Sequence, residues 1–263
     1  MTEDKYIGVD FSGASKAGRQ LWIAVAEPAT RRSGITVTSC KSAEEKWQVE
    51  GREETLSKLT EWIGSSSGAT VALDFPFAPP CGVFPADTWA ERLDEITERC
   101  RDAEQFVSEC RKEFTGNVRR ETEQERGGLC SYSPQMRYQT FHGIADLLSP
   151  LRSASGVRIE PMGSGQGSTA VIETYPAAVL DGFDDAFRNG YKQKRFQAHE
   201  RRRDNVRVLE NEGVDFDDHR WVTVADDNAL DSVIAAYAAS QAAVSGFDAP
   251  DDMYDPLEGH IYA

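Results

Sequence analysis

Short apolar runs and segments with helical periodicity follow one another in an order typical of a mixed α/β fold. Three strand-like runs come first, over residues 5–11, 20–26 and 34–40, with turn-forming residues between them. Residues 53–63 carry apolar side chains at helical spacing, and a Gly/Ser loop separates them from a further apolar run at 70–73. This order predicts an antiparallel meander, a crossover helix and a strand parallel to the first.

The chain is expected to leave this sheet after residue 74. The segment 75–80 contains three prolines, which cannot donate the hydrogen bonds of a central strand. Helical and polar patterns then dominate until a Gly/Ser loop leads into the apolar run 169–174. We expect one domain with two core segments and a largely helical insertion: core 1–74 and 169–263, insertion 75–168.

A meander that leads through a helix to a parallel strand is how ribonuclease H-like folds begin. Further helical patterns near residues 190–212 and 227–244 supply helices to cover the sheet. The expected fold is therefore a ribonuclease H-like mixed sheet, a three-stranded antiparallel meander plus parallel strands, flanked by helices.

Acidic residues end three of the apolar runs and recur in the last helix. Asp10, Asp74 and Glu173 come at strand ends, and Asp231 lies within 227–244. One such acid is as readily a turn or helix-capping residue, which is also the alternative for Asp227. Ligands of open α/β sheets gather outside the carboxyl ends of strands, so the four acids together indicate a catalytic cluster.

Carboxylate oxygens suit Mg²⁺ or Mn²⁺, and two such ions about 3.5 to 4 Å apart can activate water and stabilise a leaving oxygen. We therefore expect Asp10, Asp74 and Asp231 to bind metal, and Glu173 to complete the cluster or orient water. The reaction that fits is two-metal-ion hydrolysis of a phosphodiester.

Charge limits the substrate. The net charge of −15 argues against wrapping a long duplex, so a polyanion must meet a local patch. Residues 191–207 form one basic stretch, in which Lys192 and Arg195 are candidate phosphate contacts; the alternative is a solvated helix whose arginines pair with nearby acids. Arg120 is a weaker candidate because acidic residues follow it. Only eight of the 29 basic residues are lysines, a balance that resembles salt-adapted proteins.

Cysteine and hydropathy patterns predict a cytoplasmic protein. The five cysteines are odd in number and form no C-x-x-C pair, so neither a disulfide framework nor a zinc site is indicated. No signal peptide is recognisable, and no window approaches 18 apolar residues, so we expect no membrane partner.

Five motifs resemble a known family, the predicted nucleases catalogued as domain of unknown function 429. They are IGVDFSGA at 7–14, ALDFPFAP at 72–79, VIETYPAAVL at 171–180, NALDSVIAAYAA at 228–239 and LEGHIYA at 257–263. The resemblance implies a ribonuclease H-like nuclease of single-stranded or structured nucleic acid. It matches Asp10, Asp74, Glu173 and Asp231 to acidic metal positions and adds Glu258, from a terminal motif, as a substrate-binding candidate.

Two other functions fit parts of the pattern. The strand, acid and small-residue turn over 6–16 also opens the sugar-kinase and actin-like phosphotransferases, where the turn cradles nucleotide phosphates. A ribonuclease H-like module that binds without catalysis would keep the fold and bind no metal.

Overall fold

The computed structural model describes residues 5–29, 34–184, 187–192, 196–250 and 254–263. In this part of the chain, nine strands form one sheet in the order β6-β5-β7-β4-β1-β2-β3-β8, with β9 beside the end of β7. The strands are β1 Lys5–Asp10, β2 Trp22–Pro28, β3 Ile35–Ser42, β4 Ala69–Leu73, β5 Val157–Ile159, β6 Ser164–Gly165, β7 Thr169–Thr174, β8 Val214–Asp215 and β9 Ile261–Tyr262. The expected fold class is confirmed, because this mixed, open sheet flanked by helices agrees with a ribonuclease H-like arrangement.

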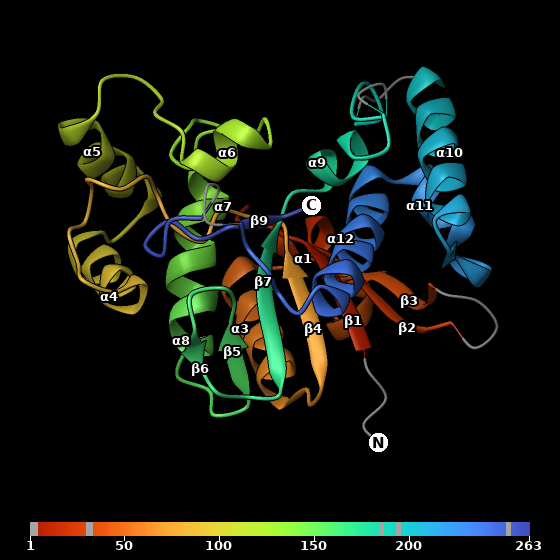
Figure 1. Cartoon of the computed structure of the whole chain (residues 1–263), viewed down its shortest axis with the longest axis horizontal. Coiled ribbons are helices and arrows are strands. Elements are labelled where there is room, and N and C mark those ends of the chain that lie inside the picture. Colours follow the sequence, from red (N-terminus) through yellow and green to blue (C-terminus); the bar gives the residue numbers. More distant parts are fainter. Residues whose placement is uncertain (1–4, 30–33, 185–186, 193–195, 251–253) are drawn as a thin grey trace.

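Helices cover both faces and fill the insertion (Figure 1). The α-helices are α1 Ala17–Gln20, α2 Ala43–Trp47, α3 Arg52–Ser65, α4 Trp89–Arg99, α5 Ala103–Glu113, α6 Glu121–Glu125, α7 Arg137–His142, α8 Ser149–Leu151, α9 Pro176–Asp181, α10 Phe196–Asn211, α11 Arg220–Ala225 and α12 Asp227–Val244. A π-helical segment, η1 Gly143–Leu148, joins α7 to α8, and a 3₁₀ turn, η2 Asp217–His219, precedes α11.

Parallel pairing brings the carboxyl ends of the central strands to one edge of the sheet. Strand β1 pairs antiparallel with β2 and parallel with β4, and β4 pairs parallel with β7. All five residues of β4 and all six of β7 are buried, which explains their continuous apolar runs. Figure 1 shows β4 and β7 side by side, pointing the same way. Side chains that follow β1, β4 and β7 therefore meet.

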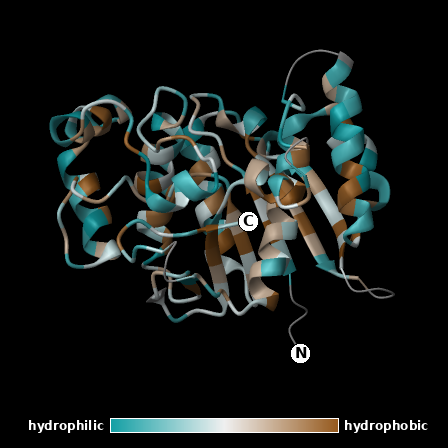
Figure 2. Cartoon of the chain, turned by 45° about the horizontal axis from the view of Figure 1, so that its top comes forward, coloured by the Kyte–Doolittle hydropathy of each residue, from teal (hydrophilic) through white to brown (hydrophobic). Residues whose placement is uncertain are grey.

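Each face of the sheet packs against a different helical layer. Helix α12 lies across β1, β2 and β4, and it stands in front of the sheet in Figure 1. Helix α3 and the π-helical segment η1 pack together with the apolar side chains of the opposite face. Figure 2 shows the apolar colouring concentrated on the strands and on the inner sides of these helices. The edge of the sheet where β1, β4 and β7 end is thus held between two packed layers of helices.

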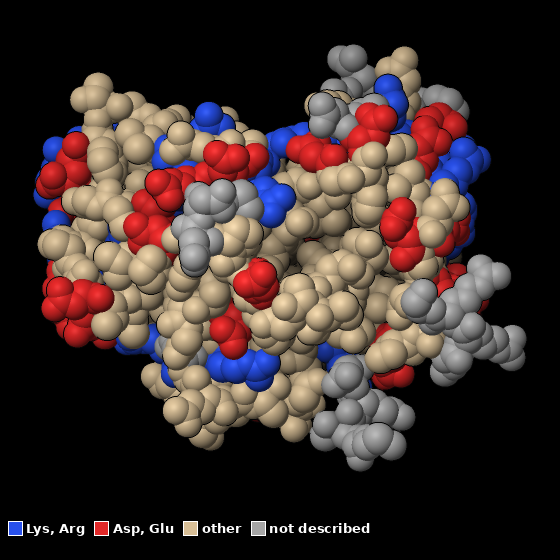
Figure 3. Space-filling view, in the orientation of Figure 1, with Lys and Arg blue, Asp and Glu red and all other residues tan. Residues whose placement is uncertain are grey.

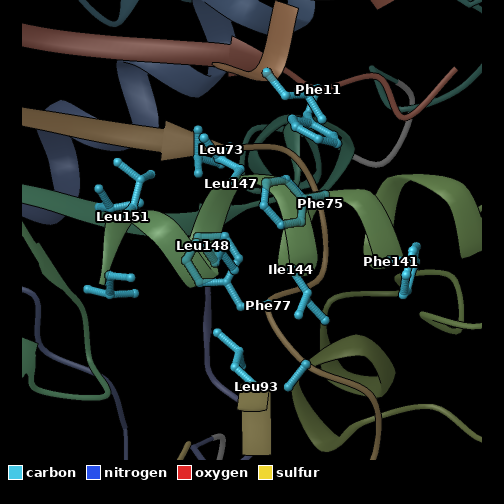
Figure 4. Close-up of a cluster of buried hydrophobic side chains, with 14 of the residues drawn as sticks. Phe11, Leu73, Phe75, Phe77, Leu93, Phe141, Ile144, Leu147, Leu148 and Leu151 are labelled. Carbon is cyan, nitrogen blue, oxygen red and sulfur yellow. The ribbon is translucent and has the colours of Figure 1, made fainter. Parts of the chain in front are cut away.

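The insertion shares the main hydrophobic core. Figure 4 shows Phe75 and Phe77, which directly follow β4 and Asp74, against Ile144 and Leu148 of η1, with Leu93 of α4 beside them. All five side chains are at most 1% exposed. The loop that carries the chain away from Asp74 is therefore fixed by packing.

The sheet resumes earlier than the sequence indicated. Residues 75–168 were expected to stay beside the sheet, but β5 pairs with β7 and β6 pairs with β5, so the sheet is extended by two strands. Strand β5 is only three residues long, too short for a recognisable strand pattern in the sequence. Within the same expected insertion, residues 121–125 form the short helix α6. Among the described residues, no helix has the length and apolar character needed to cross a bilayer.

Candidate metal centre

Three carboxylates converge at the edge where β1 and β4 end. Asp10 is the last residue of β1, Asp74 follows β4, and Asp231 lies one turn into α12. One carboxylate oxygen from each lies within 4.8 Å of the others. The residues are 8%, 8% and 1% exposed. The three metal ligands expected from the sequence are thus brought together.

Close contact between α12 and β1 puts Asp231 next to Asp10. A Cβ on Gly8 would lie only 2.0 Å from the carbonyl oxygen of Ser232 and 2.2 Å from the backbone nitrogen of Ala236. The helix backbone therefore rests directly on the strand, which only glycine permits. Ser232 follows Asp231 immediately, so the same contact fixes the height of its carboxylate above the sheet.

The cap of α12 is Asp226, whose side chain accepts hydrogen bonds from the backbone of Asn228 and Ala229. The sequence pointed to Asp227 as the capping candidate, one position too late. Asp227 lies in the first turn and is not in the group of three carboxylates. Of the two acids on that helical face, Asp231 is therefore the one at the site.

Burial and mutual repulsion favour protonation of the cluster. Burial raises the pKa of Asp10 well above its usual range, and the neighbouring carboxyls of Asp231 and Asp74 add to the rise. Burial also raises the pKa of Asp74 to about 7, although the charge of Lys192 opposes this. A cation between the carboxylates of Asp10 and Asp74 would offset both the cost of burying their charges and the repulsion between them.

Asp231 has partners on both of its oxygens. The hydroxyl of Tyr191 donates to Oδ1 over 2.9 Å, and Nζ of Lys192 lies 2.5 Å from Oδ2. Although desolvation opposes it, attraction to Asp231 raises the pKa of Lys192 well above its usual range. Lys192 therefore belongs to the same cluster as the three carboxylates. Sequence reasoning offered Lys192 as a phosphate contact and missed Tyr191, whose only signal was its position beside that lysine.

Glu173 lies at the same edge but is committed to another partner. Arg120 makes a bidentate ion pair with its two oxygens, and the backbone nitrogen of Phe77 donates to Oε2 over 2.9 Å. Glu173 is 2% exposed and Arg120 is 1% exposed. Glu173 therefore anchors the loop that follows Asp74. Its carboxylate is turned to Arg120 rather than to the other three acids.

Arg120 also ties the insertion to the end of the chain. It donates to Oε1 of Glu123 over 2.8 Å and to the carbonyl of Glu258 over 2.8 Å. The Glu258 side chain in turn accepts from the backbone nitrogens of Cys81 and Glu121, at 2.5 and 3.3 Å. Arg120 and Glu258, two of the four substrate-binding candidates, are thus buried and engaged within the protein.

A pocket of about 580 Å³ opens over Asp10 and Asp74. Its polar lining includes the side chains of Gln20, Gln139 and Asn228. Leu129 of the insertion also lines it and is 49% exposed, an apolar group at the wall of a polar pocket. The pocket is large enough for a nucleotide-sized ligand and gives solvent access to the acids.

Most described arginines of the basic stretch are already paired. Arg202 is buried and donates to the carbonyls of Tyr191 and Val224. Arg203 and Arg207 pair with acids three residues before them, Glu200 and Asp204 respectively. Arg195 lies outside the described residues. For Arg202, Arg203 and Arg207, the alternative of a helix with internally paired arginines fits better than a phosphate-binding face.

Comparison with known families shows the family of this chain. The family model described as "Protein of unknown function (DUF429)" matches residues 8–252. The chain belongs to the DUF429 family. The matched range covers all three carboxylates and Lys192, and the family description assigns no activity. No curated protein and no solved structure matched this DUF429 chain.

The donor set of the DUF429 chain fits a hard divalent cation. Mg²⁺ and Mn²⁺ prefer carboxylate and water oxygens, whereas zinc sites use histidine and cysteine. The three acids supply only oxygen donors, and their buried charges repel each other without a cation. Asp10 and Asp74, which face the pocket, are the residues that would hold such an ion.

Proposed function

We propose that this protein is a Mg²⁺- or Mn²⁺-dependent nuclease or related phosphodiesterase. The observation that carries the proposal is the convergence of Asp10, Asp74 and Asp231 within 4.8 Å of one another, beside an open pocket that Asp10 and Asp74 line. Carboxylates at the carboxyl ends of adjoining strands, on a ribonuclease H-like sheet, suit metal-assisted attack of water on a phosphodiester.

The chain's own residues have distinct roles in this proposal. Asp10 and Asp74 hold the cation, which when bound would polarise the attacking water and neutralise phosphate charge. Glu173 is a positioning residue, because it holds the backbone of Phe77 just beyond Asp74. Arg120 supports that role from within the core by neutralising Glu173. The insertion thereby takes part in shaping the site.

A single-stranded or structured nucleic acid suits the surface better than a long duplex. On the face shown in Figure 3, acidic and basic side chains are interspersed rather than gathered into a basic track. The net charge of −15 adds long-range repulsion of a polyanion. Lys192 and Arg188 line the pocket itself, so positive charge is available next to the acids. Contact with phosphate is therefore expected to be short and local.

Cleavage of labelled single-stranded, hairpin and duplex oligonucleotides in Mn²⁺ tests the proposal. Wild-type protein and the exposed control Asp218→Asn are expected to cleave, and Asp10→Asn is expected to lose at least about 100-fold in rate while unfolding cooperatively. Equal rates for wild type and Asp10→Asn would place the activity elsewhere. A Mn²⁺-soaked crystal should show anomalous density beside Asp10 and Asp74.

A further inference from the structure

We propose that Lys192 supplies the second positive charge of the site, so that Asp10 and Asp74 hold one divalent cation and Asp231 holds the lysine. This rests on the proposed metal-dependent function and deepens it, because it replaces the two-ion site expected from the sequence by one ion and one ammonium group.

The hydrogen bonding of Asp231 carries the inference. The Tyr191 hydroxyl occupies Oδ1 and the Lys192 ammonium occupies Oδ2, so both oxygens are engaged by consecutive residues of one loop. Tyr191 is 1% exposed, which fixes its end of this arrangement. Asp231 is thereby fitted to hold an ammonium group and a hydroxyl.

Asp10 and Asp74 have different surroundings. A carboxylate oxygen of Asp10 and one of Asp74 lie within 4.8 Å of each other, close enough for one ion to contact both residues. A divalent cation between two such carboxylates is attracted to both and offsets the repulsion between them. Both residues line the pocket, whereas Asp231 does not. A divalent cation can therefore reach Asp10 and Asp74 from the pocket.

Electrostatics disfavours the binding of a second ion at Asp231. Two-metal sites place the ions about 3.5 to 4 Å apart, and each ion needs carboxylate ligands. Here a second ion would have to take Asp231 from Lys192 and then remain beside the displaced ammonium. Because the ammonium lies 2.5 Å from Asp231, it already neutralises the carboxylate that such an ion would need.

Lys192 is also placed to act on a substrate. Its side chain is 47% exposed while its ammonium group reaches a carboxylate that is 1% exposed. It lines the same pocket as Asp10 and Asp74. A lysine in this position keeps its charge and can stabilise the phosphoryl oxygens as negative charge develops on them. Its role is electrostatic and requires no proton transfer.

Titration calorimetry and native mass spectrometry with Mn²⁺ alone, without nucleic acid, count the ions. Wild type, Lys192→Arg and the exposed control Lys58→Met are expected to bind one Mn²⁺ per chain. Lys192→Met frees Asp231 and is expected to bind two, with a spin-coupled manganese pair in the electron paramagnetic resonance spectrum. Thermal unfolding of each variant verifies that it is folded.

The outcomes separate this inference from the proposed function. Two Mn²⁺ ions on wild type would overturn the inference and leave a metal-dependent nuclease standing. One ion on both wild type and Lys192→Met would also overturn it, because the lysine would then not determine the ion count. Wild type that binds no Mn²⁺ would overturn both proposals.

Discussion

Replacement of Asp74 by asparagine is expected to stabilise the metal-free protein near neutral pH while removing its affinity for Mn²⁺. Asp74 is 8% exposed, and burial raises its pKa from the ordinary value of 3.8 to about 7. Between these values the folded state keeps a proton that the unfolded chain has released. The free energy of unfolding of wild type therefore falls as the pH rises through this window.

The size of the effect follows from the pKa difference. From 3.8 to about 7, at about 1.4 kcal/mol per pH unit, the loss reaches up to about 4 kcal/mol and is constant at higher pH. Asparagine carries no charge at any pH, so Asp74→Asn avoids this loss. The stability advantage of the variant should therefore grow from about pH 4 to about pH 7.

Urea unfolding in chelator, at a series of pH values, measures this difference. The matched control is Asp218→Asn, an exposed aspartate that should follow wild type throughout. Addition of Mn²⁺ should raise the stability of wild type and not that of Asp74→Asn, since ligand binding stabilises only a protein with the site. A stability difference that does not change with pH would refute the reasoning.

Three further predictions concern other parts of the molecule. Arg120→Met leaves Glu173 and Glu123 buried without their cation and should cost about 3 to 5 kcal/mol in urea unfolding; a loss below about 1 kcal/mol would show that the network is dispensable. Gly8→Ala forces α12 away from β1, so it should cost about 1 to 3 kcal/mol and weaken Mn²⁺ binding in calorimetry, whereas Gly51→Ala, with open space around it, should leave the binding unchanged. Because screening relieves acidic repulsion, the unfolding temperature should rise between about 0.2 M and about 2 M KCl; a fall would argue against salt adaptation.

The residues of the site that lie at strand ends could be predicted from the sequence. Continuous apolar runs fix where β1 and β4 end, and parallel pairing then brings Asp10 and Asp74 together whatever the rest of the chain does. Asp231 followed from helical spacing in a segment whose apolar face had to cover the sheet. These inferences depend on local pattern and on one topological rule.

The ion pairs could not be predicted in the same way. Arg120 reaches Glu173 from an inserted loop, and its neighbouring acids made it look like a solvated charge. The pairing of Lys192 with Asp231 joins residues 39 positions apart, and it depends on where the fold places Lys192 relative to α12. Strand β5 was missed because three residues give too little pattern. In each case the tertiary packing determines the contact or the strand pairing, and the spacing of residues along the sequence does not predict it.

The position of α12 after the insertion in the chain order has a consequence for synthesis. Asp10 leaves the ribosome early, but its partner on α12 is made only after the insertion and most of the sheet. Strand β9, which closes the edge of β7, comes later still. Domains generally fold as units, so a nascent chain carries the first two acids without the third. Any activity that depends on all three acids therefore begins only once α12 has been made and has packed on β1.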